Sequence, residues 1–138
     1  MAPSPSQRIA AEQKRLLIEM EVFTQEQEIR RFHAPVLFRE LKEEIELECG
    51  RINKASERVS FRSEVFSLEV RDIVNPYGLT LEYQPEAAAI QCECTRRKVG
   101  PVMLRVNRHP VPSAVLVFEG DALKPVELAA KLLSRLLA

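Results

Sequence analysis

Apolar residues recur at steps of three, four or seven in the first third of the chain, a spacing typical of amphipathic helices. From about Pro5 the sequence is rich in Gln, Glu, Arg, Leu and Ala, which are good helix formers, and residues 1–4 resemble a loose tail. A helix reaching Phe32 would be on the order of 40 Å long, more than a domain of this size easily covers. We therefore expect part of it to contact a second copy of the chain. One stripe holds Ile9, Leu16, Met20 and Phe23, and an adjacent stripe holds Ile18, Val22, Ile29 and Phe32.

Pro35 interrupts this helical pattern. The residue before a proline disfavours helical geometry, whereas a proline fits well in the first turn of a helix. We therefore predict a turn at His33 and Ala34, followed by a second helix to about Ala55. The two helices would form a hairpin over residues 5–55. The buried stripe predicted for the second helix consists of Phe38, Leu41, Ile45, Cys49 and Ile52.

From Val59 the hydrophobic period changes to two, which is typical of strands with one buried face. Turn-forming residues punctuate the segment, so residues 58–119 are predicted to form an antiparallel meander of five or six strands. Ala114–Phe118 is apolar at nearly every position, as expected of a strand covered on both faces by its own domain or by a partner. The predicted apolar face includes Phe66, Leu68, Val70, Leu79, Leu81, Tyr83, Ile90, Cys92, Cys94, Val102, Leu104 and Val106.

The last segment, residues 124–138, is predicted to be a helix with a wide apolar face. Pro125 suits its first turn, and Glu127 suits the positive end of the helix dipole. An apolar face this wide needs cover, and the inner face of the sheet provides it. The sequence thus predicts a single α+β domain over residues 5–138, with a helical hairpin, an antiparallel meander and a C-terminal helix packed on one sheet face.

Charge and composition narrow the possible functions. The chain has 138 residues, and its 20 basic side chains balance 20 acidic ones, so no long-range field draws it to nucleic acid or an anionic membrane. No window approaches the roughly 18 apolar residues of a membrane span, and the first residues lack a secretory signal. The three cysteines are an odd number with irregular spacing, which fits reduced thiols. We expect a cytoplasmic protein.

Cys92 and Cys94 are the most conspicuous candidates for chemistry, because they lie one residue apart. Zinc requires about four ligands, and the chain adds only the distant Cys49 and two separated histidines. A disulfide between alternate residues of one strand would be strained. We therefore predict that both thiols pack in the core, with no metal and no cofactor. The chain also lacks a glycine-rich phosphate loop and a serine hydrolase signature, which argues against common enzyme classes.

A basic turn offers a second candidate. Arg96, Arg97 and Lys98 are consecutive, and Arg105 follows in the next predicted strand, so these residues could contact an anion or a phosphate group. The segment lacks the aromatic residues on which nucleic-acid bases usually stack. This absence argues against a nucleic-acid ligand.

The leading hypothesis is a non-enzymatic interaction or assembly domain that forms a homodimer, because the pattern leaves surplus apolar surface. The expected interface holds Leu16, Met20 and Phe23 of the first helix, or Val115 and Val117 of the apolar strand. The alternative is a small-molecule-binding or catalytic domain with a pocket between the sheet and the last helix. That pocket would be lined by Tyr83, Cys92, Cys94 and Leu104.

Overall fold

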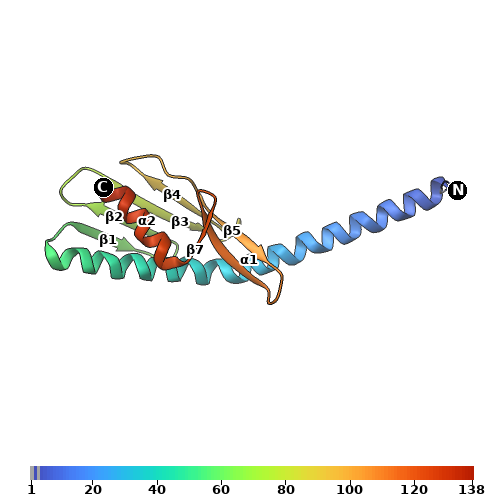
Figure 1. The fold of residues 1–138 in the computed structure, drawn as a ribbon, viewed down its shortest axis with the longest axis horizontal. Coiled ribbons are helices and arrows are strands. Elements are labelled where there is room, and N and C mark those ends of the chain that lie inside the picture. The colour runs from blue at the N-terminus through green and yellow to red at the C-terminus, as the bar shows by residue number, and fades with distance from the viewer. Residues whose placement is uncertain (1, 3) are drawn as a thin grey trace.

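One helix and one sheet account for most of the chain in the computed structural model, which describes residue 2 and residues 4–138 (Figure 1). The long helix α1 spans Pro5–Ala55 and the short helix α2 spans Pro125–Leu137. The strands are β1 (Val59–Ser63), β2 (Ser67–Asp72), β3 (Gly78–Gln84), β4 (Ala89–Cys94), β5 (Val102–Asn107), β6 (Ser113–Phe118) and β7 (Asp121–Leu123). The α+β class predicted from the sequence is confirmed.

A capping box satisfies backbone groups at the N-terminus of α1. The Ser4 hydroxyl accepts a hydrogen bond from the Gln7 amide at 3.3 Å, and the Gln7 side chain accepts one from the Ser4 amide at 2.9 Å. Pro5 occupies the first turn, where its missing N–H costs nothing. The predicted tail over residues 1–4 includes residues 1 and 3, which lie outside the described residues.

The predicted helical hairpin is wrong, because α1 continues through Pro35 without a turn. A proline inside a helix removes one backbone hydrogen bond and costs about 3 kcal/mol. Packing on both sides offsets this cost: Ala34 and Phe38 are both buried against the same core, and Pro35 itself is exposed. Ala34 is therefore a core residue of a continuous helix and not part of a turn.

The sheet has seven antiparallel strands in sequential order, rather than the five or six predicted. The extra strand β7 follows a two-residue turn in which Glu119 and Gly120 both have positive φ, a conformation that suits a tight hairpin. The joint between β4 and β5 is narrow, since only Ile90 and Val102 are paired across it. The hairpin of β5 and β6 extends past this joint and reaches α1, where the Arg108 guanidinium donates a hydrogen bond to the Gln25 side chain.

The core lies on one face of the sheet, as the two-residue period predicted. Leu68, Leu81 and Leu116 are fully buried there, and the alternating residues of the same strands face outward. Both helices contribute to this core, α1 through Leu41 and its neighbours and α2 through five buried residues. The second half of α1 and all of α2 therefore cover the same sheet face, side by side (Figure 1). The buried residues of α2 are Leu128, Ala129, Leu132, Leu133 and Leu136.

Candidate interaction surface

The first part of α1 projects from the rest of the molecule. In Figure 1 its blue half extends away from the sheet with no other element beside it. Residues 4–21 are all exposed, Val22 is half-buried, and Gln25 accepts a hydrogen bond from Arg108, which follows β5. We call residues 5–24 the arm and residues 25–138 the body.

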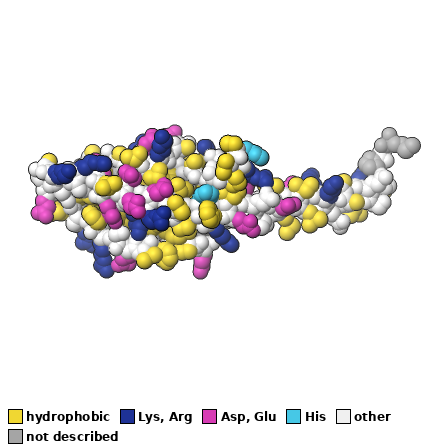
Figure 2. Space-filling view, turned by 90° about the horizontal axis from the view of Figure 1, so that it is seen from below, with side chains coloured by type: hydrophobic (Ala, Val, Ile, Leu, Met, Phe, Trp, Pro, Cys, Tyr) yellow, Lys and Arg dark blue, Asp and Glu magenta, His cyan; other side chains and the backbone are white. Residues whose placement is uncertain are grey.

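The arm carries large apolar side chains in contact with solvent. Figure 2 shows hydrophobic groups along the arm between charged ones. The residues predicted to form an interface from the first helix are among them: Leu16 is 49% exposed, Met20 65% and Phe23 62%. Ile9, at 56%, belongs to the same stripe. Isolated apolar residues on a surface are ordinary, but a periodic stripe on an uncovered helix is a candidate contact surface.

This exposed stripe continues the buried stripe of the body. Leu16 precedes the buried Ala34 by eighteen residues, which is about five turns of an α-helix. Ile9 precedes the buried Ile45 by about ten turns. One face of α1 is therefore apolar over most of its length, and the body covers only the second half of that face.

An uncovered arm is energetically unfavourable by itself. Isolated helices of this length are only marginally stable in water, and tertiary packing normally supplies the remaining stability. Each large apolar side chain that becomes buried contributes about 1.5–3 kcal/mol. A partner that covers Ile9, Leu16, Met20 and Phe23 would therefore stabilise the arm as a helix.

The second predicted interface, on β6, has a different setting. This strand lies between β5 and β7, so residues 116–118 are paired on both edges, whereas residues 113–115 pair with β5 alone. Ala114, Leu116 and Phe118 face the core, whereas Val115 and Val117 are half-buried on the outer face. The chain itself covers only the inner face of this strand. Met103, which pairs with Val117 and is 61% exposed, extends a small apolar patch there.

The residues predicted to line a pocket lie mainly within the core. Tyr83, Cys92 and Leu104 are each less than 10% exposed. The Tyr83 ring stacks on Phe38 of α1, with ring centroids 5.5 Å apart. The structure thus places the Tyr83 ring against α1.

The thiols occupy the apolar face, as predicted for core residues. Cys92 is buried opposite Leu81, and burial raises the pKa of its thiol to about 12. Burial, together with Glu48 and Glu46, raises the pKa of the Cys49 thiol to about 11. Cys94 is half-buried, and its Sγ lies 3.9 Å from the Arg135 carbonyl oxygen. Thiols with raised pKa values are poor nucleophiles near neutral pH.

The predicted basic cluster is divided between two places. Arg96 and Arg97 donate hydrogen bonds to the carbonyls of Leu136 and Ala138, at the end of α2. Cations at that end interact favourably with the negative end of the helix dipole, so these two side chains have a structural role. Lys98 is exposed in the same turn. Arg105 lies elsewhere, in a groove between β5 and α1 that Glu26 and Arg30 also line.

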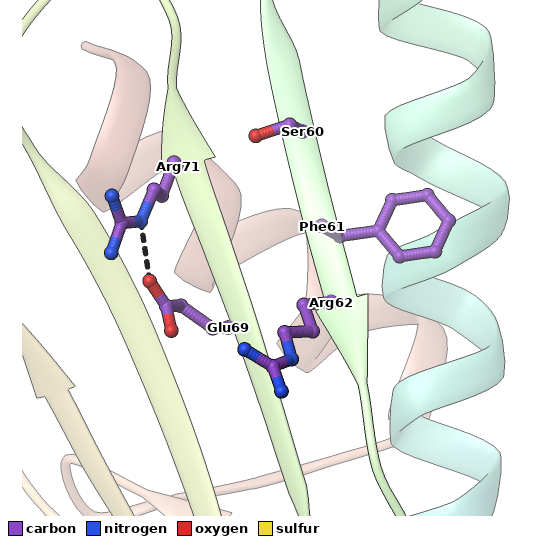
Figure 3. A pocket seen from close by; sticks show the side chains of 5 residues that line it. All are labelled: Ser60, Phe61, Arg62, Glu69 and Arg71. Atoms are coloured by element: carbon purple, nitrogen blue, oxygen red, sulfur yellow. Dashed lines mark hydrogen bonds and ion pairs between the residues drawn. The ribbon is translucent and has the colours of Figure 1, made fainter.

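A shallow hollow on the outer face of β1 and β2 contains polar groups (Figure 3). Arg71 donates a hydrogen bond to Glu69, and Arg62 and Ser60 line the same hollow. Phe61 points away from these groups toward α1 (Figure 3). The cations here are already paired, since Arg62 also lies 3.0 Å from Glu64. The hollow offers hydrogen bonds but no nucleophile paired with a base.

The most extensively bonded polar group is Asp72, which the sequence analysis missed. Its side chain is fully buried and accepts two hydrogen bonds from the Arg58 guanidinium, at 3.0 and 3.2 Å. The Val74 amide and the Asn75 amide and side chain donate three more. The bonds from Arg58 and then Asn75 and Val74 hold the pKa of this carboxyl well below its usual range, although burial acts in the opposite direction.

We call Asp72 and its partners Arg58, Val74 and Asn75 the Asp72 cluster, and this cluster links several elements of the body. Arg58 also lies within hydrogen-bonding distance of the Leu137 carbonyl of α2, at 3.4 Å. Asn53 of α1 accepts hydrogen bonds from the Arg58 and Val59 amides. The cluster therefore joins the ends of both helices to β1 and to the turn after β2. No motif marks it in the sequence, because it depends on the β1–β2 register that pairs Val59 with Asp72.

The described residues show neither a cluster of metal ligands nor a membrane-spanning helix. Within residues 2 and 4–138, no three His, Cys, Asp or Glu side chains are grouped as metal ligands. Neither described helix has an apolar segment long enough to cross a membrane. In comparisons with known proteins, no family model, curated protein or solved structure matches the chain.

Proposed function

We propose that the chain is a non-enzymatic assembly module that forms a homodimer through the arm. A single observation supports this proposal: four large apolar side chains lie exposed on a helix face that the body buries further along. The matching phase means that the arm presents the surface that packs in the body, but without a neighbour. Association would bury this surface, and hydrophobic burial is the main driving force of most protein association. The four side chains are Ile9, Leu16, Met20 and Phe23.

The mass in solution tests the proposal. One chain has a mass of 15.7 kDa, and light scattering at micromolar concentrations should give about twice that value. Leu16→Lys removes an apolar contact and adds a charge in both copies. We expect this variant to weaken association by about a thousandfold or more, so that the mass falls to one chain.

Ile18→Lys is the matched control. Ile18 is 52% exposed, much like Leu16, but lies about 200° around the helix from it, so the stripe predicted to be adjacent is on nearly the opposite face. The same chemical change there should leave the dimer intact. Because both positions are exposed, neither variant should unfold the body, and equal thermal melting of the two in protein dilute enough to be monomeric would show this. A wild-type mass of one chain across these concentrations would refute the homodimer.

A further inference from the structure

We infer that the two arms pair antiparallel, with Leu16 of one copy opposite Leu16 of the other. This inference rests on the proposed homodimer and specifies its geometry. Three features support it: the position of the sheet relative to the apolar stripe, the spacing of that stripe, and the distribution of charge along the arm.

The position of the sheet disfavours parallel pairing. The stripe that is exposed at Leu16 lies under the sheet at Ala34 and Phe38, because it is the same face of one helix. In a parallel pair both stripes would face each other, and both sheets would have to fill the space between the same two helices. In an antiparallel pair, each body lies beyond the N-terminal end of the other copy's arm. Only this orientation lets the stripes meet without a clash of bodies.

The spacing of the stripe sets the register. Ile9, Leu16 and Phe23 are spaced by seven residues, with Leu16 in the middle. When Leu16 meets its own copy, Ile9 of each chain lies opposite Phe23 of the other, so all three layers are filled. In the same register Gln7 lies opposite Gln25, whose side chain accepts a hydrogen bond from Arg108 of the body. The arm is therefore long enough to pair over its whole length, up to the second body.

The charges along the arm also favour this orientation. Between residues 5 and 15 there are three cations and one anion, and between residues 16 and 29 there are four anions and no cation. Antiparallel pairing places the cationic segment of each arm beside the anionic segment of the other, whereas parallel pairing places like charges together. Glu12 and Glu19 would approach each other across the pair, and Arg15 lies within 4 Å of both in its own helix. The cations are Arg8, Lys14 and Arg15, and the anions of the second segment are Glu19, Glu21, Glu26 and Glu28.

Disulfide trapping between variants that each carry one added cysteine tests the orientation. Chains with Ile9→Cys and chains with Phe23→Cys are oxidised separately and as a mixture, and intact mass identifies each covalent dimer. In the antiparallel pair the two Ile9 positions lie about 21 Å apart, far beyond the reach of a disulfide. We expect the mixed dimer to form at least about tenfold faster than either self-linked dimer.

Two controls accompany this experiment. The unmodified chain, treated in the same way, gives the background from Cys49, Cys92 and Cys94, which are buried or half-buried. Ala11→Cys mixed with Glu21→Cys gives a pair at matching levels of the two arms but on the outer face, and it should not exceed that background.

The outcomes separate this inference from the proposed function. Self-linking of Ile9→Cys and of Phe23→Cys, without a mixed product, would show parallel arms and overturn only the orientation. A dimeric mass with no cross-link at these positions would overturn the arm as the interface. Equal linking of the Ala11 and Glu21 pair would overturn the assignment of the face.

Discussion

In its second half, α1 buries Ala34, Phe38, Leu41 and Ile45 under the sheet, whereas in its first half the same face is open to solvent. The two halves share one helix and one hydrophobic phase, and they differ in what covers them. The body is closed by a sheet, a second helix and the Asp72 cluster, and the arm has no such cover. This difference teaches that amphipathic spacing specifies which face of a helix will be buried but not which element, or which chain, buries it.

The two halves of α1 should differ most in the free energy of unfolding that is lost when a leucine on this face is truncated. Leu41 is fully buried in the body and Leu16 is 49% exposed in the arm. Leu41→Ala should lower the free energy of unfolding by about 2–5 kcal/mol, because it leaves a cavity in the core. Leu16→Ala should change it by no more than about 0.5 kcal/mol in dilute protein, because no packed contact is lost.

Chemical denaturation of protein diluted until light scattering gives the mass of one chain, followed by circular dichroism, measures both values. Leu16→Ala should become destabilising only as the concentration rises into the range where the unmodified chain associates. A loss for Leu16→Ala in dilute protein as large as that for Leu41→Ala would mean that the arm packs on its own body.

The next largest difference in stability between body and arm variants should come from removing a carboxylate charge, which is buried in the body and exposed in the arm. Asp72→Asn removes the charge that Arg58 neutralises, and we expect a loss of on the order of 3 kcal/mol. Glu12→Gln, in the exposed Glu12–Arg15 pair of the arm, should change stability by less than about 0.5 kcal/mol. The unfolding midpoints of these two variants, measured at pH 7, test this expectation.

The contribution of Asp72 should also depend on pH in a defined direction. Its pKa in the folded state lies below the unfolded value of about 3.9, so the stabilisation is complete above that pH. It should decrease as the pH falls from about 4 toward the folded-state pKa. Stability measured between pH 7 and pH 2 should therefore fall less for Asp72→Asn than for the unmodified chain. An identical acid dependence for both proteins would show that Asp72 makes no such contribution.

Local pattern was sufficient to predict most of the body. The two-residue period placed Leu68, Leu81 and Cys92 on one face, because a strand with one buried face alternates apolar and polar residues in its sequence. The hairpin was predicted from the local cost of a proline inside a helix, without the packing of Ala34 and Phe38 that offsets this cost. The structure shows a continuous α1 instead. The matching phase of Ile9 and Ile45, which lie on either side of the proline, could have revealed the continuous helix, since two separate helices have no need to share one phase.

The candidate surface could be predicted in part. Leu16, Met20 and Phe23 were identified from spacing alone, but their exposure depends on where the sheet ends along α1. The Asp72 cluster could not be predicted, because its partners come from α1, β1, α2 and the turn after β2. The same limit applies to Arg96 and Arg97: their proximity in sequence suggested an anion site, and their contacts with the end of α2 are visible only in the fold.

The smallest difference in stability between body and arm variants should come from replacing one arginine in each, Arg96 and Arg15. Arg96 donates a hydrogen bond to the last turn of α2, and its guanidinium lies 5.2 Å from the centre of the Tyr77 ring. Arg15 of the arm is 65% exposed beside Glu12 and Glu19. Arg96→Gln should cost about 0.5–1 kcal/mol, because it removes a favourable charge from the helix end and a contact with the ring. Arg15→Gln should have no measurable effect on unfolding of the dilute protein.

Salt can separate the two contributions of Arg96. Interaction with the helix end weakens as ionic strength rises, so the destabilisation in Arg96→Gln should shrink between low and high salt. Thermal unfolding at several sodium chloride concentrations measures this trend, and a cost that stays constant would assign the effect to ring packing. Equal destabilisation by Arg15→Gln would contradict the distinction between arm and body, because an arginine without a body contact would then stabilise the fold as much as one that holds α2 in place.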